Sequence, residues 1–230
     1  LNDILYIASS KSALLKESNK SRAKKIMQKL NIATADFFTT GPNEHKNEKA
    51  IPIAFPLFVK PITGGDSRGI DANSIVYNYE DFKRKVLDIK LKQHSRCLVE
   101  KYLSGKEYSV GIFKDNLDST IETMPIEIIV KKNINGHHIL DFDIKKNDEE
   151  KVVAVLDKKI FKQLCFIAKK SFVALDGKSF GRIDIKMDCL GNPHFIEANL
   201  MPGIRKGYFF RSCLLNLGIS YEEMILKITA

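Results

Sequence analysis

The sequence predicts a fold that mixes helices with strands, and in which two strands form an antiparallel hairpin. Apolar residues recur at helical spacing in several segments, as in the stripe Ala23, Ile26, Met27 and Leu30. Other segments alternate with period two, most clearly on both sides of residues 190–192. With 230 residues, the chain can bury a substantial core in one large domain or in two lobes.

The elements expected along the chain follow from these two periods. The first helix carries the stripe at Ala23 and takes Ser18 or Asn19 as its N-cap. Strands are expected over residues 51–60, 96–102, 108–113, 121–130 and 138–142, and then in a hairpin over residues 181–186 and 194–199. Further helices are expected around Phe82, Val86 and Ile89, over residues 157–174, and around Tyr221, Met224, Ile225 and Ile228.

The first residues of the chain indicate a fragment. The chain begins with Leu rather than Met, and residues 4–8 have the composition of a strand that already lies inside a fold. We therefore expect an N-terminal part of the natural protein to precede residue 1.

Composition narrows the class of protein. No apolar run approaches the length of a membrane span, and no segment has the pattern of a signal peptide. Cys97, Cys165, Cys189 and Cys213 have no paired spacing, which predicts free thiols in a reducing compartment, by default the cytoplasm. The net charge of +9 is spread along the chain without a basic block that contains aromatic residues, so nucleic-acid binding is disfavoured.

The hairpin carries an unusual polar cluster. With a turn centred between Leu190 and Gly191, antiparallel pairing sets Lys186 opposite Phe195, Asp184 opposite Glu197, and Arg182 opposite Asn199. Carboxylates directly across a ladder repel each other unless a cation lies between them. The oxygen ligands of Asp184, Glu197 and Asn199 suit Mg²⁺. The alternative is a solvated strand face on which charges simply alternate.

Two further segments have the residue types that a nucleotide needs. A strand that ends in Lys60 is followed by a loop with Gly64, Gly65, Ser67 and Gly69, whose N–H groups can surround phosphates. This loop lacks the GK[ST] ending of a Walker A motif, and an ordinary turn is the alternative. Residues 98–107 read as a strand and a tight connection, which can bind a purine edge and ribose hydroxyls or form only a charged turn.

Six motifs in this order resemble the ATP-grasp superfamily and, within it, the D-alanine:D-alanine ligase-like branch, over about residues 8–230. The motifs are Ser18-Asn19-Lys20, Phe58-Val59-Lys60-Pro61, residues 99–107, Asp141-Phe142-Asp143-Ile144-Lys145, Gly181-Arg182-Ile183-Asp184, and residues 197–203. The resemblance implies an α+β fold with two lobes whose antiparallel sheets hold ATP between them. It implies a remnant of an N-terminal or linking segment over residues 1–20, a smaller lobe over 21–103, and a larger lobe with the magnesium site over 104–230.

The resemblance also implies a role for each matching residue. Those implied to bind the nucleotide are Lys20, Lys60, Gly65, Ser67, Glu100, Lys101, Tyr102, Leu103, Glu107 (ribose) and Lys145. The implied metal ligands are Asp184, Glu197 and Asn199, for Mg²⁺ or alternatively Mn²⁺. The implied catalytic groups are Lys60, Arg182, which stabilises the oxyanion, and the N–H of Gly203.

The activity that the resemblance implies is that of an ATP-dependent carboxylate–amine ligase that works through an acyl phosphate. Its partners would be ATP, a small carboxylic acid, and an amino acid or amine. The chain has Asp66-Ser67 where the dipeptide ligases have two serines, and a basic segment over residues 204–211, so we expect a different substrate. Arg205, Lys206 or Arg211 would recognise an acidic substrate group or an acidic carrier protein, or else face solvent.

Two matters stay open at this level. The rival function is a catalytically reduced ATP-binding module with a regulatory or interaction role; Arg182 favours the enzyme, because nucleotide binding alone needs no oxyanion stabiliser. A homodimer is also left open.

Overall fold

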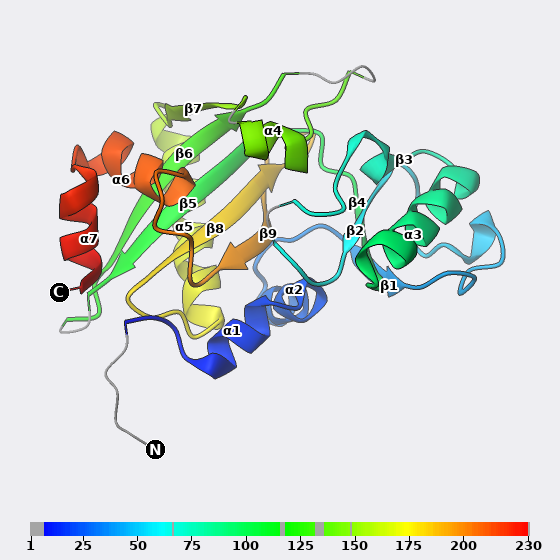
Figure 1. The fold of residues 1–230 in the computed structure, drawn as a ribbon, viewed down its shortest axis with the longest axis horizontal. Coiled ribbons are helices and arrows are strands. Elements are labelled where there is room, and N and C mark those ends of the chain that lie inside the picture. The colour runs from blue at the N-terminus through cyan, green and yellow to red at the C-terminus, as the bar shows by residue number, and fades with distance from the viewer. Residues whose placement is uncertain (1–6, 66, 116–117, 132–135, 148, 230) are drawn as a thin grey trace.

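Two antiparallel sheets, each covered by helices, make up the fold (Figure 1). The structure is a computed structural model that describes residues 7–65, 67–115, 118–131, 136–147 and 149–229. The smaller sheet has the strand order β1-β4-β2-β3, and the larger sheet has the order β7-β6-β5-β8-β9. This arrangement confirms the predicted α+β class.

The smaller sheet packs against one helix. Its strands are β1 (Phe37–Thr40), β2 (Leu57–Pro61), β3 (Ile75–Val76) and β4 (Cys97–Lys101), with the short 3-10 helices η1 (Glu48–Ala50) and η2 (Ala72–Ser74) between them. Helix α3 (Tyr79–Gln93) buries Phe82, Val86 and Ile89, the predicted stripe, against Val59 and Val99. Asn78 caps this helix, because its side chain accepts a hydrogen bond from the Asp81 N–H.

The larger sheet is covered on both faces. Its strands are β5 (Glu107–Lys114), β6 (Ile121–Ile129), β7 (Lys151–Ala154), β8 (Phe180–Met187) and β9 (Pro193–Asn199). Helix α5 (Lys158–Ala174) packs on the face that carries Val110 and Ile183, whereas α6 (Tyr208–Leu217) and α7 (Tyr221–Thr229) pack on the face that carries Phe113. The second face also carries Arg182 and Asp184, because side chains alternate along β8.

The N-terminal helices lie at the end of the larger sheet. Asn19 is the N-cap of α2 (Lys20–Lys29), whereas Ser18 ends α1 (Lys11–Glu17), so of the two predicted caps Asn19 is correct. Ala23 and Met27 of α2 pack in the core of the larger sheet, although the predicted lobe boundary grouped residues 21–103 together. None of the helices within the described ranges is both long and apolar enough to span a membrane.

Two crossings join the sheets. After α2, the Thr34 hydroxyl donates to the Phe195 carbonyl at 2.8 Å, and the Lys101 N–H donates to the Asp36 carbonyl at 2.9 Å. Where the chain passes back from β4 to the larger sheet, the Gly105 N–H donates to the Met187 carbonyl at 3.0 Å. These backbone contacts fix the edge of β9 and the end of β4 next to each other, which places the candidate site between the sheets.

Several predicted elements differ from the structure. Residues 138–142 form no strand: Asp141 accepts from the Ile144 N–H at 2.9 Å and begins helix α4 (Phe142–Asn147). The strand predicted from residue 51 starts only at Leu57. Strands β1, β3 and β7 and helix α1 were not predicted. Residues 4–6 of the predicted first strand lie outside the described residues, and Ile7 and Ala8 are not in a strand.

The hairpin register is correct at its open end. Asp184 pairs with Glu197 and Arg182 pairs with Asn199, as predicted. Lys186, however, pairs with His194 rather than Phe195, because an irregularity after Asp184 adds one residue to β9. The bulge turns Phe195 into the core, where it is fully buried, and leaves Glu197 in the cleft.

Gly105 supplies a test of the second crossing. A Cβ at this position would lie 2.6 Å from the Asp188 carbonyl oxygen and 2.6 Å from Met187 Cβ. We expect Gly105→Ala to lower the free energy of unfolding by about 1–3 kcal/mol, because backbone must move to admit the methyl group. Gly65→Ala is the control, since its Cβ would meet nothing within 4 Å. Equal denaturation midpoints for the two variants would contradict this account.

Candidate active site

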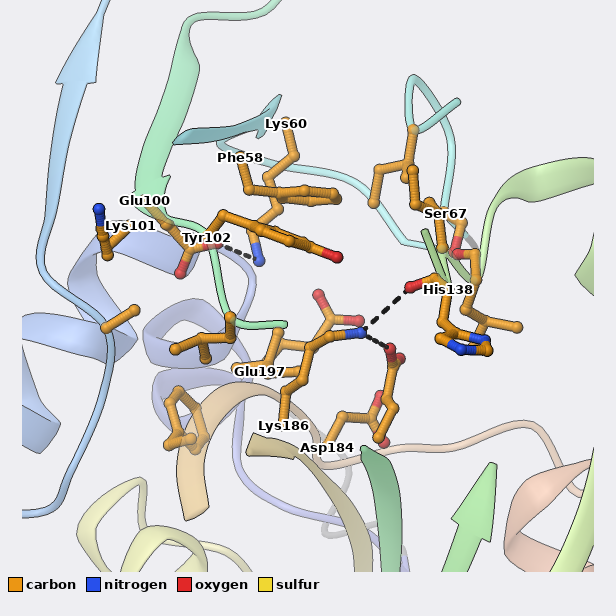
Figure 2. A pocket seen from close by; sticks show the side chains of 18 of the residues that line it. Phe58, Lys60, Ser67, Glu100, Lys101, Tyr102, His138, Asp184, Lys186 and Glu197 are labelled. Atoms are coloured by element: carbon orange, nitrogen blue, oxygen red, sulfur yellow. Dashed lines mark hydrogen bonds and ion pairs between the residues drawn. The ribbon is translucent and has the colours of Figure 1, made fainter. Parts of the chain in front are cut away.

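A cavity opens between the two sheets, and Figure 2 shows the side chains of both lobes that point into it. The smaller lobe contributes Phe58, Lys60, Ser67, Glu100, Lys101, Tyr102 and Leu103, and the larger lobe contributes Glu107, Lys145, Asp184 and Glu197. A second, adjoining cavity is lined by Lys20, Lys60, Gly64, Gly65, Ser67 and Glu197. The structure therefore gathers most of the predicted site residues, far apart in sequence, around one cleft.

Two buried lysines pair with one glutamate in the smaller lobe, next to the cavity. Lys60 comes from β2 and is only 2% exposed, and its Nζ lies 2.6 Å from Oε2 of Glu100 on β4. Lys24 of α2 pairs with the other oxygen of Glu100. Burial alone would raise the pKa of Glu100, but these two ammonium groups more than offset it and lower that pKa to about 2. Glu100, which the resemblance placed among the nucleotide-binding residues, thus has its carboxylate held by two cations.

Lys20 approaches the same cleft from the first turn of α2. Its ammonium contacts the Gly64 carbonyl of the glycine-rich loop and lies 3.8 Å from Glu197 Oε2. Burial lowers the pKa of Lys20, while Glu197 acts in the opposite direction. Ser67 connects the glycine-rich loop to the larger lobe, because its hydroxyl donates to the Leu140 carbonyl at 3.0 Å.

Arg182 and Asp184 form a buried fork on β8. Arg182 Nε and Nη2 donate to the two Asp184 oxygens at 3.0 and 2.9 Å, and the Ser109 hydroxyl donates to Oδ1 at 2.7 Å. The Arg182 guanidinium also lies 5.5 Å from the ring centroid of Tyr208. The carboxylate and the guanidinium are therefore oriented before any ligand arrives.

Glu197 lies across the ladder from Asp184 and within reach of several cations. Burial would raise the pKa of Glu197, but Lys20, Lys60, Lys145 and Arg182 together hold that pKa below its ordinary value. Asn199, two residues further on, accepts from the Met201 N–H at 3.2 Å. Of the three predicted metal ligands, all with oxygen donors, Asp184 and Glu197 lie opposite each other and line the cavity. Asn199 lies opposite Arg182 and lines neither cavity at the site.

Residues of β2, of the connection between β4 and β5, and of β9 form the apolar side of the cavity. Phe58 and Tyr102 line it (Figure 2), and so do Leu103 and Phe195. At its rim, Lys186 Nζ donates to Glu107 Oε2 at 2.8 Å.

Two predicted site residues, Lys101 and Gly203, lie differently from the rest, whereas Lys145 lines the cavity. Lys101 Nζ bonds the Ala54 and Phe55 carbonyls at 3.1 and 3.3 Å, so only its backbone and stem can face a ligand. Lys145 lies 5.7 Å from the Tyr208 ring centroid, and Gly203 lies exposed in the loop after β9.

The basic residues before and within the first turn of α6 differ in their exposure. Arg211 lies 3.6 Å from the buried Glu150, whereas Arg205 and Lys206 are exposed. Lys206 Nζ stands 5.8 Å from the Tyr221 ring centroid. The predicted recognition of an acidic group by these residues stays a prediction, with Arg205 and Lys206 as the two side chains open to solvent. Asp66, which marked the departure from the dipeptide ligases, lies outside the described residues.

Several site residues were missed in the sequence. Lys24, Ser109, Tyr208 and Glu17 have no motif of their own. Lys24 could have been found from its spacing of four residues after Lys20, which puts both on one helix face. The other three reach the site only through tertiary packing.

Glu17 yields a pH-dependent prediction. Its Oε2 accepts from the Leu200 N–H at 2.9 Å, and burial, reinforced by Glu197, raises its pKa from 4.5 to about 7. The native state therefore holds a proton that the unfolded chain has lost, so stability falls as pH rises from about 4.5 through 7. We expect Glu17→Gln to raise the free energy of unfolding at pH 8 by about 1 kcal/mol and to leave it unchanged at pH 4. Urea denaturation at both pH values checks this, and an equal effect at both would contradict it.

Comparison with known proteins agrees with this geometry. Residues 26–230 match the family model described as the D-ala D-ala ligase C-terminus. The chain is 30% identical over 230 residues to the D-alanine–D-alanine ligase of Aquifex aeolicus, with 97% of this chain and 72% of that protein covered. It is 29% identical over 229 residues to D-alanine–D-alanine ligase B of Clostridium perfringens, with 97% and 71% covered.

Solved structures share the fold. The D-alanine–D-alanine ligase from Bacillus anthracis complexed with ATP superposes with a TM-score of 0.77 at 22% identity, over 98% of this chain and 69% of that one. The VanG D-Ala:D-Ser ligase from Enterococcus faecalis gives a TM-score of 0.77 at 20% identity, over 97% and 64%. The predicted ATP-grasp fold is therefore confirmed. On the extent of the sequence match, the chain belongs to the D-alanine–D-alanine ligase C-terminal family.

Proposed function

We propose that this chain forms the ATP-binding part of a carboxylate–amine ligase that activates a small carboxylic acid as an acyl phosphate and joins it to an amino group. The observation that carries the proposal is the convergence of Lys20, Lys60, Asp184 and Glu197, with Arg182 held behind them, on one cleft between the sheets. The match to the ligase family supports the reaction class.

The residues divide the work between two steps. Phosphoryl transfer to a carboxylate depends mostly on positioning and charge neutralisation, which Lys20, Lys60 and Lys145 would supply from the two sides of the cleft. When the amine attacks the acyl carbon, the tetrahedral oxyanion needs fixed donors, and Arg182 and the Gly203 N–H are proposed for that role. The phosphate then leaves and an amide remains.

The apolar side of the cavity suits the base and the rim suits the sugar. Phe58, Tyr102 and Leu103 offer flat and aliphatic surface to a purine. The backbone of Leu103 is proposed to bond the purine edge, since the Lys101 and Tyr102 N–H groups already donate to the Asp36 and Pro56 carbonyls. The Glu107 carboxylate is proposed to accept from the ribose hydroxyls, with Lys186 holding it in place.

Asp184, Glu197 and Asn199 are proposed to hold Mg²⁺, or alternatively Mn²⁺. Within the described ranges no group of three or more His, Cys, Asp or Glu side chains could bind a metal alone. Two carboxylates and an amide oxygen nevertheless fit Mg²⁺, which fills its remaining positions with water and phosphate oxygens. When bound there, the ion would neutralise charge on the transferred phosphoryl group.

The named relatives define the first substrates to test. The curated relatives are D-alanine–D-alanine ligases and one solved neighbour is a D-Ala:D-Ser ligase, so D-alanine is proposed first as the carboxylic acid that is activated. The basic segment favours a different acceptor, and acidic amino acids belong in the panel with D-alanine and D-serine.

The proposal is tested by release of ADP and formation of a dipeptide from ATP, Mg²⁺ and pairs drawn from that panel. We expect turnover with at least one pair that contains a D-amino acid. Tight binding of ATP without turnover for any pair would instead support an ATP-binding module that has lost ligation.

A further inference from the structure

Lys24 is a charged side chain with no access to the cleft. It lies one turn after Lys20 on α2, is 0% exposed, and lines neither of the two cavities at the site. Its Nζ pairs with Glu100 Oε1 and lies 5.4 Å from the ring centroid of Phe37. A lysine that is fully buried in this way cannot contact the nucleotide, and it needs another explanation.

Lys24 is explained by its pairing with Glu100, whose carboxylate also pairs with Lys60. Its two oxygens bind two different lysines, Lys24 through Oε1 and Lys60 through Oε2 at 2.6 Å. Of these three side chains only Lys60 and Glu100 line the cavity. Two ammonium groups against one carboxylate leave one net positive charge, and that charge is exposed to a ligand only through Lys60.

We propose that Lys24 is a positioning residue that holds Glu100 away from full neutralisation of Lys60, and so keeps a positive charge available for a polyphosphate. The inference rests on the proposed nucleotide-binding function of the cleft. Without Lys24, Glu100 and Lys60 would form a closed neutral pair, and an incoming phosphate would compete with Glu100 for the same ammonium group. Lys24 therefore acts through Glu100, without touching the ligand.

This charge balance predicts a rescue that a merely structural role would not show. Lys24→Met removes one positive charge and makes the cluster neutral. The double variant Lys24→Met with Glu100→Gln removes one charge of each sign, so the cluster regains the single positive charge of the wild type on Lys60. Because the double variant leaves the buried Lys60 without its Glu100 partner, a thermal melt of both variants shows that they are folded before their affinities are compared.

The matched control is Lys85, a second buried lysine in the smaller lobe. Lys85 is 3% exposed and pairs with Asp71 at 2.9 Å, outside the cavities at the site. Lys85→Met therefore reports the general cost of removing a buried lysine from this lobe.

The experiment is calorimetric binding of inorganic triphosphate with Mg²⁺, with adenosine as a second probe that carries no phosphate. For Lys24→Met we expect triphosphate affinity to fall about tenfold or more, the effect of one lost charged hydrogen bond, with adenosine affinity unchanged. For Lys85→Met, triphosphate affinity should lie within about threefold of wild type. For the double variant it should rise at least about threefold above that of Lys24→Met, without having to reach the wild-type value, because Glu100 itself lines the cavity.

The outcomes separate this inference from the proposed function. Equal triphosphate affinity for wild type and Lys24→Met, or a double variant as weak as the single one, would overturn the role of Lys24 while leaving the nucleotide site standing. A wild-type protein that binds neither triphosphate nor an ATP analogue would overturn both. Parallel losses for adenosine and triphosphate would also overturn it, since they would indicate general damage to the lobe.

Discussion

Replacing Asp184 by Asn together with Glu197 by Gln is expected to abolish the Mg²⁺-dependent part of binding of a non-hydrolysable ATP analogue. The two carboxylates occupy one register position across β8 and β9, and they are the only charged members of the proposed ligand set. Without them we expect affinity in the presence of Mg²⁺ to fall by roughly 100-fold. Affinity for the metal-free analogue should be unchanged or higher, because two negative charges have left the neighbourhood of the phosphates. Isothermal titration calorimetry with and without Mg²⁺ measures both.

The matched control removes two carboxylates from the same sheet at a distance from the cleft. Glu122 and Glu127 on β6 pair with Lys227 and Lys106 at 3.3 and 2.9 Å, and neither lines a cavity at the site. Glu122→Gln with Glu127→Gln therefore matches the change in net charge, and its Mg²⁺ dependence should be that of the wild type. If the site variant kept the metal dependence, the two carboxylates would hold no metal and would serve only in their ion pairs with Arg182 and Lys20.

The sequence predicted the centre of this site because its signal is local. Alternation along both arms and a turn at Gly191 were enough to pair Asp184 with Glu197, and the structure has that pair. The prediction failed at Lys186, because the irregularity after Asp184 depends on Phe195 turning into a core that forms only in the folded chain. A period of two contains no information about that extra residue.

Other parts of the site could not be predicted, because they are set by packing between distant segments. Ser109 reaches Asp184 only because β5 lies beside β8, and Lys24 reaches Glu100 only because α2 contacts the smaller sheet at β1. At residues 138–142, by contrast, the sequence predicted a strand that the structure does not have. Their apolar residues resemble a strand, but Asp141 caps a helix, and Ile139 and Leu140 are buried at the cavity wall.

Arg182 is the residue whose loss should most affect catalysis. Its guanidinium holds Asp184 through two parallel hydrogen bonds and is packed near the Tyr208 ring, so it is preorganised near the start of β8. Removing one fixed oxyanion donor costs about 100- to 1,000-fold in kcat in enzymes that use such donors. We expect Arg182→Gln to lower kcat for ligation by that factor, and Arg182→Lys to lower it as well, because an ammonium cannot reproduce the fork.

The same variants distinguish catalysis from nucleotide binding. If Arg182 acts on the oxyanion, Arg182→Gln should bind the ATP analogue within about threefold of wild type while losing turnover, since the interaction is made only in the transition state. Transfer of the phosphoryl group precedes formation of the oxyanion, so exchange of bridging and non-bridging oxygens in labelled ATP, with the carboxylic acid present, should persist. Loss of this exchange together with turnover would place Arg182 at the phosphoryl-transfer step. An unchanged kcat would remove it from the mechanism, and its fork with Asp184 would then serve only to hold that carboxylate in place.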